Sequence, residues 1–173
     1  MSGTRVWESK LTPLHFLERS AHVFRERTAV IHGSARYTYP EFQQRVNRLA
    51  SALRAAGLQK GDRVAFLAPN IPPLLEAHFG VPLAGGILVA INTRLSAQEI
   101  VYILNHSGSK ILFVDTELIG AIEPILHQLE STQTIVNIPD LPEGKRLDAP
   151  DYESFLKTGS PNRIDWLLED EEE

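Results

Sequence analysis

The sequence predicts an α/β fold in which a mostly parallel sheet is flanked by helices. Three unbroken apolar runs occur, at Val64–Ala68, Ile87–Ile91 and Ile111–Val114, and continuous apolarity is typical of strands covered on both faces. Segments with helical signals separate these runs, and such alternation favours parallel strands joined by helical crossovers. We therefore expect all three strands to be sheathed by helices.

The helix before the first apolar run is predicted by its start. Thr38 and Glu41 have the spacing of a capping box, in which each side chain bonds the backbone amide of the other residue. Gly57 supplies a stop, because glycine readily takes the left-handed conformation after a helix. Arg45 falls outside the apolar face. That face is formed by Phe42, Val46, Leu49, Ala50 and Leu53.

The next helix is predicted to start near Asn70, whose side chain can cap it, with Pro72 and Pro73 in the first turn. Pro82 has no amide, and its ring clashes with the carbonyl of His78. We therefore expect a break in the helix at Pro82.

The remaining elements follow from similar signals. Ser96 and Glu99 form a second capping box, for a helix that stops near Gly108. A small hairpin is expected around Gly33-Ser34, between Ala29–His32 and Arg36–Thr38. Further predictions are a helix over Leu118–Leu129, a weaker strand over Thr134–Ile138 and a short helix over Tyr152–Leu156.

We divide the chain into an α/β subdomain over residues 1–138 and a loop-rich tail over residues 139–173. The tail is punctuated by proline and glycine, which mark turns and loops. These residues are Pro139, Pro142, Gly144, Pro150, Gly159 and Pro161.

Composition excludes several classes of protein. The net charge is −5 with no cluster of Lys and Arg, whereas nucleic-acid binding needs a basic patch. The absence of cysteine excludes disulfides and thiolate metal sites and suits a reducing, cytoplasmic compartment. No apolar run approaches the ~20 residues that span a membrane, so we expect no transmembrane segment.

No residue can be selected as catalytic, cofactor-binding or metal-binding. The histidines lack the spacing of metal ligands, and we interpret them as surface or structurally satisfied residues. They are His15, His22, His32, His78, His106 and His127. Gly85-Gly86 precedes a strand rather than following one, so close packing of helix on strand explains it better than a dinucleotide fingerprint.

Two positions keep a functional alternative open. Asp115 follows the third apolar run and could bind a ribose hydroxyl or a metal, but capping of the next helix is favoured. Asn92-Thr93-Arg94 follows the second run. It could line a cleft, although a loop held by side-chain hydrogen bonds is favoured.

The ordered series of motifs from residue 12 to residue 138 resembles the acyl-activating, AMP-forming ligase superfamily, in particular its medium- and long-chain fatty acyl-CoA synthetase branch. The pieces that carry this resemblance are Tyr37–Phe42, Arg48–Leu53, Gly57-Leu58, Lys60–Ala65, Pro69-Asn70, Glu76–Pro82, Ile91–Ser96, Glu99-Ile100, Leu104–Lys110 and Phe113–Asp115.

The resemblance implies that a full-length member makes an acyl-adenylate from a carboxylic acid and Mg-ATP and passes the acyl group to coenzyme A. In such a member the phosphate loop, the nucleotide motif, the ribose-binding Asp and the catalytic Lys would lie beyond residue 173. The resemblance thus implies that this chain is an incomplete N-terminal portion of the large domain, with no catalytic or ATP-binding residue and no activity alone.

Two further interpretations remain. The chain could be a non-enzymatic interaction module derived from the same fold, or an unrelated doubly wound nucleotide-binding domain. Because the expected sheet would lack part of its covering, we also predict self-association or a separate partner chain that carries the rest of the synthetase.

Overall fold

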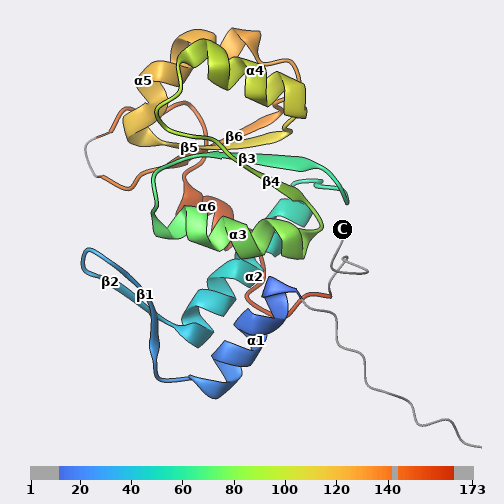
Figure 1. Ribbon diagram of the computed structural model, residues 1–173, viewed down its shortest axis with the longest axis vertical. Helices are drawn as coiled ribbons and strands as arrows, with labels where there is room; N and C mark the ends of the chain where they lie inside the picture. Colours follow the sequence, from blue (N-terminus) through green and yellow to red (C-terminus); the bar gives the residue numbers. More distant parts are fainter. Residues whose placement is uncertain (1–11, 142–143, 166–173) are drawn as a thin grey trace, which may run out of the picture.

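The computed structural model describes residues 12–141 and 144–165, which form a helix, a hairpin and then alternating strands and helices (Figure 1). The strands are β1 Thr28–His32, β2 Ala35–Thr38, β3 Arg63–Leu67, β4 Ile87–Ala90, β5 Ile111–Asp115 and β6 Thr134–Ile138. The α-helices are α1 Pro13–Val23, α2 Tyr39–Ala55, α3 Pro72–Ala84, α4 Ala97–Ser107, α5 Ile119–Ile122 and α6 Tyr152–Lys157.

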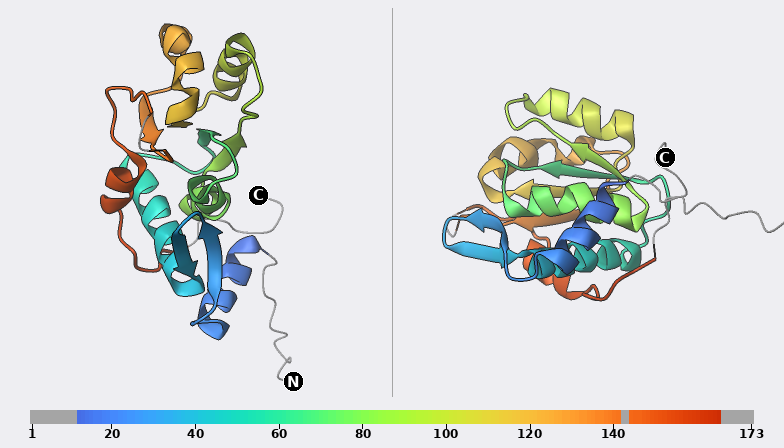
Figure 2. Two further views of the ribbon diagram at one scale, coloured as in Figure 1. Left: turned by 90° about the vertical axis from the view of Figure 1, so that its left-hand side faces the viewer. Right: turned by 60° about the horizontal axis from the view of Figure 1, so that its bottom comes forward.

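The predicted fold class is confirmed. The main sheet has the strand order β4-β3-β5-β6, and all its neighbouring strands are parallel. Helices α4 and α5 cover one face, and α2, α3 and α6 lie on the other (Figures 1 and 2). The antiparallel hairpin of β1 and β2 is also present where it was predicted.

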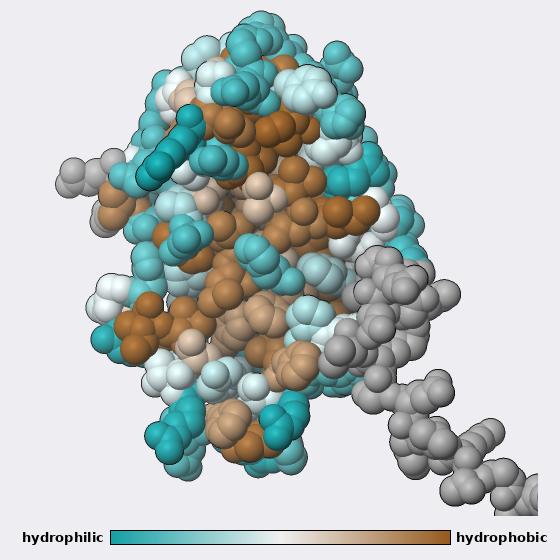
Figure 3. Space-filling view, viewed as in Figure 1, coloured by the Kyte–Doolittle hydropathy of each residue, from teal (hydrophilic) through white to brown (hydrophobic). Residues whose placement is uncertain are grey.

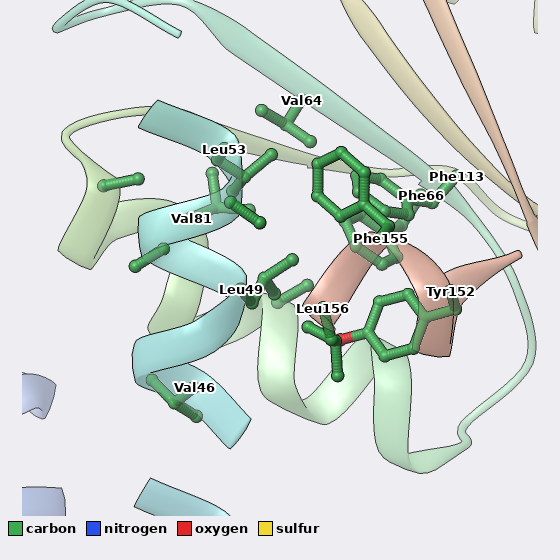
Figure 4. Close-up of a cluster of buried hydrophobic side chains, with 14 of the residues drawn as sticks. Val46, Leu49, Leu53, Val64, Phe66, Val81, Phe113, Tyr152, Phe155 and Leu156 are labelled. Carbon is green, nitrogen blue, oxygen red and sulfur yellow. The ribbon is translucent and has the colours of Figure 1, made fainter. Parts of the chain in front are cut away.

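The core is divided by the sheet into two clusters of buried apolar side chains. On the α2 side, Phe66 of β3 stacks on Phe113 of β5 with ring centroids 4.3 Å apart, and Phe155 of α6 meets Phe113 edge-on (Figure 4). On the other side, Leu67 and Leu112 pack with the apolar faces of α4 and α5. β3 and β5 are therefore covered on both faces, as their sequences predict.

The expectation that β4 is covered on both faces is wrong. Ile87 is 53% exposed, and Ala90 is also exposed. β4 is an edge strand that pairs only with β3 in the described structure, so an unbroken apolar run did not imply complete burial.

Both predicted capping boxes are present. The Thr38 amide donates to the Glu41 carboxylate at 2.7 Å, while the Glu41 amide donates to the Thr38 hydroxyl at 3.4 Å. Ser96 and Glu99 repeat the arrangement at 2.8 Å and 3.4 Å.

The start and end of α3 differ from the prediction. Ile71, not Asn70, precedes the helix as its cap and makes no side-chain bond there. Pro72 and Pro73 remove two amides that a capping side chain would bind. At the other end, the helix continues through Pro82 to Ala84 and stops at Gly85, where φ is 91°.

The Arg54 side chain provides hydrogen bonds to backbone carbonyls at this end of α3. Its guanidinium donates to the carbonyls of Leu83 and Ala84 at 2.8 Å and 3.3 Å. These carbonyls lie in the last turn, where helical partners are missing in any helix. Because Pro82 also lies in this turn, its missing amide removes a bond only near the helix end.

Two other segments depart from the expectation. The predicted helix over Leu118–Leu129 consists of α5 between the short 3₁₀ segments η1 Thr116–Leu118 and η2 Glu123–Gln128, because Pro124 interrupts the helical bonding. Helix α1 was not predicted, although it buries Leu14, Leu17 and Ala21.

Beyond residue 138, the predicted short helix is confirmed as α6, which buries Tyr152, Phe155 and Leu156 in the α2-side core. The boundary between subdomain and tail stays a prediction. Among the described helices, none is both long and apolar enough to cross a membrane.

Candidate functional site

The carboxyl ends of β3 and β5 form the candidate site because the chain changes direction around β3. After β3, α3 leads to β4 on one side. After β4, α4 leads across to β5 on the other side. In open parallel sheets, ligands bind outside the carboxyl ends of the strands at such a switch point.

Asp115 ends β5 at this position, and its side chain caps the following 3₁₀ turn. One carboxylate oxygen, Oδ1, accepts the Glu117 amide at 2.9 Å, which confirms the capping role. The other, Oδ2, is buried without a hydrogen-bond partner, as is the hydroxyl of Thr116. Burial raises the pKa of Asp115, and the nearby charges of Asp140 and Glu117 act in the same direction.

Three hollows lie near the carboxyl ends of the strands. One of about 410 Å³ lies between the ends of β3 and β4, and one of about 270 Å³ lies between β1 and the start of α3. A third, of about 440 Å³, lies between the hairpin, the start of α3 and residues 138–141. The Asn92 side chain lies in the first hollow and accepts the Arg94 amide at 2.9 Å, which confirms a loop held by side-chain hydrogen bonds.

A partly buried ionic network lies beside the third hollow. Arg45 of α2 donates through Nε to Glu76 of α3 at 2.6 Å and through its two terminal nitrogens to Glu153 of α6 at 2.5 Å and 3.1 Å. The Tyr152 hydroxyl donates to the other Glu76 oxygen at 2.7 Å. The Arg45 guanidinium also lies 4.8 Å from the ring centre of Tyr37.

This network joins three helices rather than forming a reactive group. Burial raises the pKa of Tyr152 and the Glu76 carboxylate raises it further, so the phenol keeps its proton and remains a donor. The Arg45 guanidinium already donates hydrogen bonds to two carboxylates through all three of its nitrogens, so it has no pair of N–H groups free to bind an anionic ligand. Sequence reasoning missed these partnerships because helical spacing identifies faces and not distant partners.

The histidines do not converge on a site. His32 Nε2 lies 3.0 Å from Asp140 Oδ1, and His78 Nδ1 lies 2.8 Å from the Leu74 carbonyl oxygen in its own helix. Within residues 12–141 and 144–165, no group of three or more His, Cys, Asp or Glu residues could hold a metal ion.

Glycines in the described regions do not build a phosphate-binding loop. Gly85 and Gly86 end α3 and lead into β4, as the sequence predicts. A Cβ at Gly86 would lie 3.0 Å from the Leu58 side chain and 3.2 Å from the Asp62 carbonyl oxygen, which supports the packing explanation.

The comparisons with known proteins place this geometry in context. Residues 17–167 match a family model described as AMP-binding enzyme. The chain is 40% identical over 161 residues to 4-hydroxybutyrate–CoA ligase 2 of Metallosphaera sedula, covering 91% of this chain and 29% of that protein. It is 39% identical over 158 residues to a peroxisomal benzoate–CoA ligase of Arabidopsis thaliana, at 87% and 27% coverage.

Solved structures give the same relationship. An anthranilate CoA ligase with bound anthranoyl-AMP superposes with a TM-score of 0.82 at 25% identity, over 91% of this chain and 30% of that one. A Rhodopseudomonas palustris protein described as a long-chain-fatty-acid CoA ligase gives 0.74 at 30% identity, over 87% and 37%. The chain thus spans less than two fifths of the length of each of these proteins.

Proposed function

This chain belongs to the AMP-binding enzyme family, and from that premise we propose that it supplies the N-terminal part of an acyl-CoA ligase. The reaction converts a carboxylic acid, ATP and coenzyme A into acyl-CoA, AMP and diphosphate. The family match over residues 17–167 carries this proposal. The relatives and solved structures named above, all described as CoA ligases, support it.

The acid that we propose is a medium- or long-chain fatty acid. The motifs that resemble the fatty acyl-CoA synthetase branch and the description of the R. palustris protein support this choice. Similar proteins are described as ligases of 4-hydroxybutyrate, benzoate and acetate or butyrate, so short and aromatic acids are the competing substrates. We place the protein in the cytoplasm because its lack of cysteine suits a reducing compartment.

ATP, Mg²⁺ and coenzyme A take part in the proposed reaction. The described residues do not have the arrangement that a binding site for ATP or Mg²⁺ requires. Triphosphate binding needs backbone amides that converge at a helix start together with a cation. The described helix starts follow no glycine-rich loop, and the described part of the chain holds no metal-ligand cluster. We therefore assign no reaction step to this chain and propose that it is inactive alone.

Acid-dependent exchange of pyrophosphate into ATP tests the proposal. We expect no exchange by the 173-residue chain. We expect exchange by a fusion in which this chain replaces the matching segment of the M. sedula relative, assayed with butyrate, benzoate, octanoate and palmitate. Exchange by the chain alone would overturn its proposed inactivity.

The alternative function, a non-enzymatic interaction module, is favoured by the same lack of a phosphate-binding loop in the described regions. It predicts that a folded fusion shows no exchange with any of the four acids. That result would overturn the ligase proposal.

A further inference from the structure

Helix α1 presents large apolar side chains to solvent. Of the eight large apolar residues exposed within residues 12–141 and 144–165, three lie in α1 or at its C-cap. They are Phe16, Val23 and Phe24, which are 58%, 53% and 43% exposed. Single exposed apolar residues are normal on a protein surface, whereas a group of them usually marks an interaction surface.

Two of these residues lie on the side of α1 that faces away from the protein. The helix buries Leu14, Leu17 and Ala21. With 3.6 residues per turn, Phe16 and Val23 are about two turns apart and lie on the same side, opposite to the buried residues. A helix that is simply solvated on its outer side would carry polar residues there.

Arginine side chains surround the apolar residues. Arg19 lies between Phe16 and Val23 on the helix, Arg25 and Arg27 follow the helix directly, and all three arginines are exposed. Arg25 stays beside α1, because its Nε donates to the carbonyl of the last turn of the helix at 3.1 Å. In the part of the chain that the structure describes, neither Arg19 nor Arg27 forms an ion pair.

The acidic residues of this stretch do not cancel the positive charge. Residues 13–27 contain three arginines and two glutamates. Glu18 is already paired, since Arg163 Nε donates to its carboxylate at 2.8 Å. Glu26 is the other acidic residue. The surface is therefore positive on a chain whose net charge is −5, and its charge is complementary to an anionic partner.

The position of α1 favours a flat partner. The helix lies beyond α2, at the end of the molecule furthest from α4 and α5 (Figures 1 and 2). Figure 3 shows apolar atoms between hydrophilic ones at this lower end of the molecule. A stable protein interface takes about 20–30 residues on each side, many more than this projecting end contains. A second copy in a symmetric dimer would bring the same arginines together, which is repulsive.

We propose that α1 binds reversibly to the surface of a membrane that contains anionic phospholipid. The contact is the α1 outer surface, defined as Phe16, Arg19, Val23, Phe24, Arg25 and Arg27. Its apolar side chains enter the boundary between headgroups and acyl chains, while its arginines contact lipid phosphates. Each arginine close to such a membrane strengthens binding by about fivefold. Binding of this kind needs no membrane-spanning helix, and it does not depend on the proposed ligase reaction.

Co-sedimentation with lipid vesicles tests the proposal. The chain, diluted until monomeric, is mixed with vesicles of phosphatidylcholine alone or of equal amounts of phosphatidylcholine and phosphatidylglycerol. We expect at least about 10-fold tighter binding to the mixed vesicles. Phe16→Ser and the double change Arg19→Gln with Arg27→Gln should each weaken this binding by at least about 10-fold.

The matched controls change the same residue types away from α1. Tyr102→Ser removes an aromatic side chain that is 66% exposed on α4, and Arg94→Gln removes an exposed arginine after β4. Both should leave vesicle binding unchanged. Equal binding to the two kinds of vesicle, or equal binding by the chain and its α1 variants, would overturn the proposal.

A fluorescent label identifies the surface that meets the lipid. The chain contains no cysteine, so Val23→Cys, Tyr102→Cys and Ile87→Cys each accept one label whose emission shifts to the blue in an apolar environment. We expect the shift with the mixed vesicles at position 23 and not at position 102. A shift at position 87 alone would show that the exposed edge strand β4 makes the contact, and the proposal would be wrong.

The fusion with the M. sedula relative provides the last test. We expect it to bind the mixed vesicles and to lose this binding on Phe16→Ser. A folded fusion that binds no vesicles would show that the remainder of the protein covers α1, which would overturn the proposal. Exchange of pyrophosphate by the fusion is measured separately, so that failure of the membrane contact and failure of the ligase function are distinguished.

Discussion

Arg45 connects more of the structure than any sequence pattern indicated. Its guanidinium is mostly buried, with 17% of the side chain exposed, and the Glu76 side chain that it contacts is completely buried. Burial alone lowers the pKa of Arg45, but the carboxylates of Glu153 and Glu76 more than offset this and raise it. A single cation thus satisfies charges from two other helices.

Replacing Arg45 by Met should destabilise the protein by about 3–5 kcal/mol, because it leaves the Glu76 charge buried without its cationic partner. The matched change is Glu153→Gln, which removes the outer partner, 55% exposed. A surface pair of this kind contributes only about 0–1 kcal/mol. Urea unfolding of both variants measures the difference, and equal losses would contradict the assignment of Glu76 as the critical partner.

At the scale of single elements, local chemistry was predictable and position in the sheet was not. The capping boxes at Thr38 and Ser96 depend on residues three apart, so the sequence contains all the information. The exposure of β4 depends on its place in the strand order, which no local pattern encodes. Helix α1 was not predicted, although Thr12 and Pro13 are a cap-type residue and a proline at the first helical position.

Gly80 determines how closely α3 approaches α2. A Cβ at this position would lie 2.8 Å from Leu49 Cδ2 and 3.1 Å from Leu49 Cβ, and Leu49 is completely buried. Gly80→Ala should therefore destabilise the protein by about 1–2 kcal/mol, since overpacking costs about 1–3 kcal/mol and alanine recovers at most about 1 kcal/mol of helix propensity.

The matched control is Gly120→Ala in α5, where a Cβ would meet no heavy atom within 4 Å. This change should be neutral or stabilising by up to about 1 kcal/mol. Thermal unfolding of the two variants compares them directly. A stabilising Gly80→Ala would show that the two helices can separate without loss.

At the scale of the whole molecule, the fold class could be predicted because apolar runs and helix signals alternate along the chain. The grouping of residues around the candidate site could not, since it brings together residues such as His32 and Asp140, which are 108 positions apart in the chain. For Asp115, sequence reasoning correctly favoured a capping role. Its unpaired, buried second oxygen is visible only in three dimensions.

The isolated chain should self-associate at tens of micromolar, because β4 is an apolar edge strand that pairs only with β3 in the described structure and leaves Ile87 53% exposed. Ile87→Lys should reduce this association, while Tyr102→Lys on α4 should leave it unchanged. Sedimentation velocity with a dye that binds apolar surface provides the measurement. A compact wild-type monomer that binds no dye would show that the segment closes its own core.

The bond between Tyr152 and Glu76 also has a consequence for the timing of synthesis. The two residues are separated by 76 positions, and ribosomes add about 5–20 residues per second. Glu76 therefore waits about 4–15 s on the growing chain before its phenolic partner exists. During that interval the layer of α2 and α3 lacks α6, and Phe113 lacks its edge-on neighbours Tyr152 and Phe155. The core on the α2 side of the sheet is consequently completed only after the core on the α4 side, whose buried residues have all been synthesised by Ile125.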